Sequence, residues 1–137
     1  MSVTPTVLPV DPLAFPDNAS SAERLAACKA YLQAHGAELR ARHAAGISGL
    51  EIAHERSATI DRMLIRLFDH AYALYVRDQG KPPAPVALVA LGGYGRGELS
   101  PFSDVDLMFL FPAKTKPAAI KSFLEHLTNE ILYPLWD

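Results

Sequence analysis

The sequence predicts an α/β fold, of the α+β kind by its layers, in which a small mixed sheet is flanked by helices and preceded by a helical hairpin. The first indication is the recurrence of apolar residues at helical spacing through most of residues 20–80. The second is a pair of short apolar runs at 86–91 and 107–111, each of a length typical of a strand. A further helical pattern from residue 117 onward supplies a helix that can pack on the sheet.

Composition and charge narrow the class of protein. With 137 residues, half of them hydrophobic and a fifth charged, the chain fits one globular domain. Its net charge of −2 provides no attraction for nucleic acid, so we expect no nucleic-acid partner. Cys28 is the single cysteine, which excludes a disulfide framework within this sequence and suits a reducing compartment. Because we find neither an apolar run of bilayer length nor a signal peptide, we expect a cytoplasmic protein with no membrane partner.

Residues 1–19 form the first of three regions that we expect along the chain. Four prolines between residues 5 and 16 exclude a helix and most strand pairing. The region is therefore an extended arm. It either packs Leu8, Leu13 and Phe15 on the rest of the domain or forms a frayed tail.

Residues 20–80 form the second region, which we expect to be helical and packed on the sheet domain. A capping box at Ser20 to Glu23 begins a helix that reaches about His43. A second capping box at Ser48 to Glu51 begins a longer helix, from about Leu50 to Arg77. The two helices together make the predicted hairpin.

Residues 81–137 form the third region and contain the most informative stretch of the sequence. The apolar run Val86 to Leu91 leads directly into Gly92-Gly93. Ten residues later, Asp104-Val105-Asp106 leads into the second apolar run. The first strand thus ends at a glycine pair, and the second begins at an acid pair. This arrangement predicts a ligand site between the two strands.

The glycine pair is suited to binding phosphate. Glycine has no Cβ and tolerates positive φ, so the backbone at Gly92 and Gly93 can approach a ligand closely. N–H groups at the start of a helix attract anions, and Tyr94 to Leu99 can supply the first turn or two of such a helix. Arg96, within this segment, could pair with a phosphate through its planar guanidinium.

The acid pair is suited to binding a cation. Residues i and i+2 of a strand point to the same face, so Asp104 and Asp106 should project together, about 6.6 Å apart at Cα. Val105 should then point into the core. Two carboxylates would repel a phosphate unless a cation lay between them, and Mg²⁺ or Mn²⁺ suits oxygen ligands of this kind. The chemistry indicated is in-line attack on a nucleotide α-phosphate, assisted by metal ions.

Other glycine-rich phosphate motifs fit this stretch poorly. A P-loop requires Lys followed by Ser or Thr after its last glycine, whereas Gly97 is followed by Glu98-Leu99. The spacing from Gly93 to Gly97 also differs from the dinucleotide fingerprint, and the second strand follows too soon for a crossover helix. We expect Glu98 to order the loop through an ion pair rather than to take part in chemistry.

The pattern Leu91-Gly92-Gly93, ten residues, then Asp104-Val105-Asp106-Leu107 resembles the signature of the polymerase-β-type nucleotidyltransferase superfamily. The fuller string GGYGRGELSPFSDVDL is more specific. It resembles the N-terminal domain of the bifunctional uridylyltransferase/uridylyl-removing enzymes that modify the PII nitrogen-signalling protein. Flanking segments agree, so that the resemblance covers about Leu39 to Asp137.

The resemblance implies a transferase that moves UMP from UTP to a tyrosine of PII and releases pyrophosphate. The two aspartates would then hold Mg²⁺, and the two glycines would hold the triphosphate with help from Arg96 and Ser103. The Ser103 hydroxyl either contacts phosphate or caps the turn at Asp104.

Two further expectations and two alternatives follow from the resemblance. Its core has a third carboxylate on a later strand, and no acid after Asp106 fits that place, so we expect a fragment that is incomplete at its C-terminus. The HD hydrolase domain and the glutamine-sensing ACT domains of the family would also lie outside this sequence. The alternatives are another nucleotidyltransferase, such as one that transfers AMP to a protein or small molecule, and a regulatory module that binds nucleotide without turnover.

Overall fold

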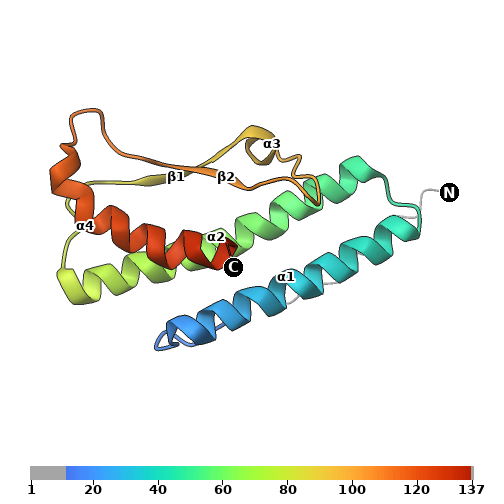
Figure 1. The fold of residues 1–137 in the computed structure, drawn as a ribbon, viewed down its shortest axis with the longest axis horizontal. Coiled ribbons are helices and arrows are strands. Elements are labelled where there is room, and N and C mark those ends of the chain that lie inside the picture. Colours follow the sequence, from blue (N-terminus) through green and yellow to red (C-terminus); the bar gives the residue numbers. More distant parts are fainter. Residues whose placement is uncertain (1–11, 137) are drawn as a thin grey trace.

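A computed structural model describes residues 12–136 of the chain, and the predictions made above for Leu8 and Asp137 lie outside this range. Two long helices run side by side, and a two-stranded sheet and a C-terminal helical segment lie along the second of them (Figure 1). The elements are α1 Ser21–Ala44, α2 Gly49–Gln79, β1 Ala87–Leu91, α3 Gly92–Gly95, β2 Asp106–Leu110, α4 Pro117–Leu127, the π-helical η1 Thr128–Leu132, and α5 Tyr133–Trp136. The predicted α/β class with an N-terminal helical hairpin is therefore confirmed.

Helices α1 and α2 begin where their capping residues predict. The Ser20 hydroxyl accepts a hydrogen bond from the Glu23 N–H at 3.1 Å, and the Glu23 carboxylate accepts one from the Ser20 N–H, which completes a capping box. At α2 the Ser48 hydroxyl accepts from the Glu51 N–H at 3.2 Å, but within residues 12–136 Glu51 makes no reciprocal bond to the Ser48 N–H, so only half of the predicted capping box forms. Both helices extend one or two residues beyond the predicted ends, which is the usual scatter at helix ends.

The part of the arm that the structure describes packs on α2. Leu13 is buried in the core. The Arg66 guanidinium donates a hydrogen bond to the Phe15 carbonyl at 2.9 Å. Its central carbon also lies 4.2 Å from the centroid of the Phe15 ring. The His70 Nε2 donates to the Asp17 carbonyl at 3.1 Å. Between residues 12 and 19 the arm is therefore docked, which favours the first of the two predicted alternatives.

The two described strands are antiparallel, with Leu91 opposite Asp106. Along the sheet, residues alternate between a covered and an open face, as the strand period requires. The inward residues pack against the helical core: Leu88, Ala90, Leu107 and Phe109. The outward residues Met108 and Leu110 are exposed. Both strands are shorter than predicted, since β1 begins at Ala87 rather than Val86 and β2 at Asp106 rather than Asp104.

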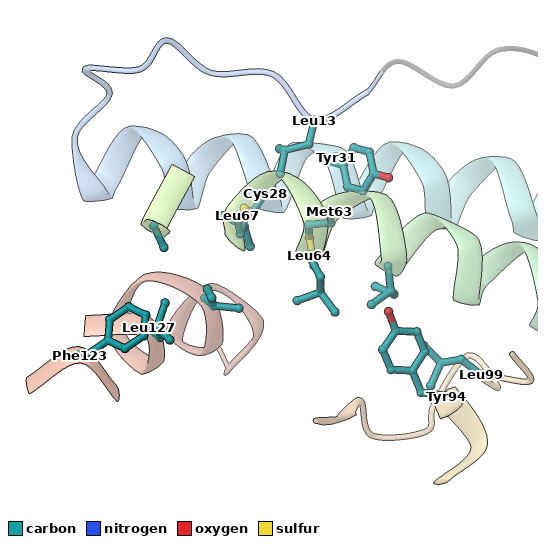
Figure 2. Packing of buried hydrophobic residues seen from close by; sticks show 13 residues of the cluster. Leu13, Cys28, Tyr31, Met63, Leu64, Leu67, Tyr94, Leu99, Phe123 and Leu127 are labelled. Atoms are coloured by element: carbon teal, nitrogen blue, oxygen red, sulfur yellow. The ribbon is translucent and has the colours of Figure 1, made fainter. Parts of the chain in front are cut away.

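The core lies between the helices and under the sheet, and it joins elements that are far apart in the sequence (Figure 2). The largest fully buried side chains come from α1, α2, α4, η1 and the loop after α3: Cys28, Met63, Leu67, Leu99, Phe123, Leu127 and Ile131. Burying each such side chain contributes about 1.5–3 kcal/mol. Between residues 12 and 136, no helix is both long enough and apolar enough to cross a membrane.

The C-terminal helical segment, which the sequence predicts from residue 117 onward, contains a proline near its end. Pro134 does not stop it, because α4 widens into the π-helical η1 directly before α5, which contains Pro134. Proline has no N–H to donate to the carbonyl four residues earlier, and a π-turn accommodates that loss without ending the helix.

Candidate nucleotide and metal site

The glycine pair lies in a tight helical turn at the end of β1. This turn, α3, begins at Gly92 itself, whereas the sequence predicts a helix that starts at Tyr94. Gly92 has a φ of +60°, as the prediction of a glycine-dependent backbone requires, but Gly93 does not have a positive φ. No side chain caps the start of α3, which leaves the first N–H groups of the turn without a side-chain acceptor.

Two close approaches explain why glycines occupy this turn. A Cβ placed on Gly92 would lie 3.0 Å from the Asp106 Oδ2. A Cβ placed on Gly95 would lie 2.8 Å from the Ala90 carbonyl oxygen, a distance that real side chains do not adopt. The glycine turn is therefore pressed against both strands, and the structure brings Gly92 and the Asp106 carboxylate together.

The acid pair lies on the open face of the sheet. Asp104 and Asp106 are exposed and Val105 between them is half-buried, as the predicted alternation requires. Asp104 itself precedes β2 rather than belonging to it. Among the described residues, neither carboxylate forms a hydrogen bond or an ion pair with the protein, so both are free to bind a ligand.

Oxygen donors of this type fit Mg²⁺ or Mn²⁺. Because the Asp106 carboxylate lies close to Gly92, a cation bound to it would lie beside the glycine turn. Over residues 12–136, no group of three or more His, Cys, Asp or Glu side chains is arranged to hold a metal ion. The candidate donors are thus two carboxylates, with the remaining positions open to phosphate oxygens and water.

Arg96 and Ser103 lie in the loop between the turn and the acid pair. The Arg96 Nε is 3.8 Å from the Glu98 carboxylate, which confirms the predicted ion pair, and both side chains are exposed. An Arg96 guanidinium nitrogen would lie 3.7 Å from a Cβ on Gly93, so the cation is beside the turn. The Ser103 N–H donates to the Ser100 carbonyl at 3.0 Å, but its exposed hydroxyl caps nothing in the described chain. Its contact with phosphate stays a prediction.

Helix α2 supports the loop through residues that the sequence analysis did not single out. The Tyr94 hydroxyl donates a hydrogen bond to the Asp61 carboxylate, and the Leu99 N–H donates to the Ser57 hydroxyl at 2.9 Å. Burial, followed by the hydrogen bond to Asp61 and its charge, raises the pKa of the Tyr94 phenol far above its usual value, so this group remains a donor. No pattern in the sequence links these four residues, because the pairs are 33 and 42 positions apart.

A cavity of about 410 Å³ lies on the covered side of the sheet, between β1 and α2. Its lining includes Leu64, Phe68, Leu88 and Leu107. The inward position of Leu88 and Leu107 places it on the opposite side of the sheet from Asp106. We therefore do not assign it to the nucleotide.

Comparison with known proteins agrees with this geometry. The family described as "Putative nucleotidyltransferase DUF294" matches residues 33–135, which include both the glycine turn and the acid pair. No solved structure matches the chain significantly.

Bacterial relatives named bifunctional uridylyltransferase/uridylyl-removing enzyme are similar to most of the chain. The protein from Methylococcus capsulatus is 41% identical over 115 residues, which cover 84% of this chain and 12% of that protein. Those from Novosphingobium aromaticivorans and Caulobacter vibrioides are 36% and 40% identical, over 66% and 67% of this chain and 9% of each relative. The chain thus spans only a small part of the length of these relatives. From the family match and these identities, the chain belongs to the DUF294 nucleotidyltransferase family, as its resemblance to the uridylyltransferases predicts.

Proposed function

We propose that this chain carries the nucleotide-binding half of a metal-dependent uridylyltransferase, which moves UMP from UTP to a tyrosine of the PII protein. The observation that carries the proposal is the closeness of the Asp106 carboxylate to Gly92, where an added Cβ would lie 3.0 Å from Oδ2. It joins a turn suited to phosphate with a carboxylate suited to a cation. Family membership supports nucleotidyl transfer, and the names of the relatives support UMP as the group transferred.

The residues of the chain divide the proposed work between them. The turn at Gly92 and Gly93 would bind the triphosphate through backbone N–H groups, and Arg96 would add a positive charge. Asp104 and Asp106 would hold Mg²⁺ or Mn²⁺, which when bound neutralises phosphate charge and polarises the phosphoryl group. In the reaction a tyrosine oxygen of the acceptor bonds to the α-phosphorus of UTP, and the bond from that phosphorus to pyrophosphate breaks.

The experiment is a transfer assay with the protein, purified PII and each nucleoside triphosphate labelled at its α-phosphate. We expect label to move from UTP to PII with Mg²⁺ or Mn²⁺ and to stay on UTP with a chelator. Asp104→Asn and Asp106→Asn should each abolish transfer. Asp69→Asn is the matched control, because Asp69 is also exposed but lies on α2, away from the acid pair.

The other outcomes distinguish the alternatives. Transfer of AMP, or of another nucleotide, would keep the nucleotidyltransferase assignment and refute the uridylyl one. Binding of Mg·UTP with no transfer to any acceptor would refute catalysis and favour a regulatory module.

A further inference from the structure

We propose that Ser57 and Asp61 of α2 are positioning residues for the transfer reaction, which hold the glycine turn at a fixed place relative to Asp106. This inference rests on the proposed function, because it assigns a role within that same site. Neither residue is near enough in sequence to the turn to belong to its motif.

The two residues anchor the loop at two separated points. Asp61 accepts the hydrogen bond of the Tyr94 hydroxyl, and Ser57 accepts that of the Leu99 N–H at 2.9 Å. Since Ser57 and Asp61 are four positions apart on α2, they lie on one face of the helix, one turn from each other. Figure 2 shows the Tyr94 phenol directed from the loop toward α2, with Leu99 beside it.

Three of the four anchoring residues are buried, whereas Asp61 and the loop between the anchors are exposed. Ser57, Tyr94 and Leu99 have exposed fractions of 3%, 5% and 0%. Arg96, between the anchors, is exposed. A loop held at one end by a buried bond and at the other by a part-buried bond keeps its place on the protein while its middle faces solvent, which a phosphate-binding segment requires.

Close packing within the turn links the position of Tyr94 to that of the acid pair. Gly95, next to Tyr94, packs against the Ala90 carbonyl, and Gly92 packs against the Asp106 carboxylate. The approach at Gly95 is to backbone and leaves no room for a Cβ, and the one at Gly92 is tight, so a shift of the turn at Tyr94 changes its place relative to Asp106. A displacement near 1 Å is enough to lower a reaction rate by about 100-fold.

In this proposal the Tyr94 hydroxyl positions the turn through its bond to Asp61, whereas the Tyr94 ring packs in the core. Tyr94→Phe therefore keeps the buried ring and removes the bond to Asp61. Asp61→Leu removes the same bond from the other side, and Asp61→Asn retains an oxygen that can accept it. Asp69→Leu is the matched control, because Asp69 is an exposed aspartate two turns further along α2.

The test measures kcat and KM for UTP in the PII transfer assay, the Kd for Mg·UTP, and the melting temperature of each variant. We expect Tyr94→Phe and Asp61→Leu each to lower kcat by about 10- to 100-fold. The kcat of the double variant should be no lower than that of either single variant, because both changes break the same hydrogen bond. Asp61→Asn should recover most of kcat, and Asp69→Leu should match the wild-type protein.

Several results would overturn the inference. A wild-type kcat in Tyr94→Phe, or losses that add in the double variant, would show that the bond does not position the turn. A lower melting temperature with no change in kcat would show that the Tyr94–Asp61 bond contributes to stability alone. Asp61→Asn as inactive as Asp61→Leu would implicate charge instead of position. If the wild-type protein transferred no nucleotide, the proposed function itself would fail.

Discussion

Replacing Gly95 with alanine tests how closely the glycine turn is packed against the sheet. A Cβ at this position would lie 2.8 Å from the Ala90 carbonyl oxygen and 3.1 Å from its carbon. Both atoms belong to the backbone of β1, so neither can move aside by rotation of a side chain. Either the turn shifts away from β1 or the strand bends, and each movement disturbs the contacts of Tyr94 with α2.

The size of the effect follows from the cost of forcing extra atoms into a packed region. Overpacking typically destabilises a protein by about 1–3 kcal/mol. For a domain of this length, a loss of 1 kcal/mol lowers the melting temperature by about 4 °C. We therefore expect Gly95→Ala to lower the melting temperature by about 4–12 °C.

Gly36→Ala provides the matched control, since Gly36 lies inside α1 and its added Cβ would be 3.4 Å from the flexible end of Arg40. Alanine is favoured over glycine in a helix by about 0.8–1.0 kcal/mol, so this variant should be more stable than the wild-type protein. Thermal unfolding followed by far-UV circular dichroism measures both changes. A Gly95→Ala variant as stable as the wild-type protein would refute the close packing of the turn.

Three further predictions use other features of the structure. Gly92→Ala places a Cβ at a φ of +60° and 3.0 Å from the Asp106 carboxylate, so it should destabilise the fold by about 1–2 kcal/mol and reduce nucleotide transfer more than Gly36→Ala does. Arg24→Ala leaves Glu130 without its buried ion-pair partner and should cost about 3 kcal/mol in urea unfolding, whereas an exposed pair would cost under about 1 kcal/mol. Burial raises the pKa of the Cys28 thiol from 9.0 to about 11, which means that the folded state favours the protonated form. This contribution is complete below pH 9 and is lost as the pH rises through 11, so stability should fall by about 3 kcal/mol across that interval in the wild-type protein and by less in Cys28→Ala.

Local signals in the sequence predict the elements of the fold well. Ser20 and Ser48 form the capping bonds expected of them. The alternation through Asp104, Val105 and Asp106 places the acids on the open face and the valine toward the core, as predicted. These features depend on residues within four positions of each other, and such short-range interactions are readable from sequence.

The support of the site could not be predicted in the same way. The bond from Tyr94 to Asp61 joins a loop to a helix 33 residues earlier, and the other two aspartates of α2 are also exposed and look equivalent in sequence. The start of α3 at Gly92 was also missed, because the helical turn is imposed by packing of Gly95 on Ala90 and not by helix propensity. Tertiary contacts of this kind become visible only when the chain is folded.

The fold exposes the acids of the site and buries the donor groups that hold the turn beside them, and the chemistry of the groups explains this division. Two neighbouring carboxylates lose several kcal/mol each if they leave water with no cation to pair with them. Asp104 and Asp106 therefore remain on the open face, where a cation and a phosphate can reach them. A neutral phenol and a backbone N–H can be buried at little cost when each has an acceptor, as Tyr94 and Leu99 have on α2. The fixed geometry of the site thus comes from buried neutral donors, while its carboxylates, including the acceptor Asp61, stay on the surface.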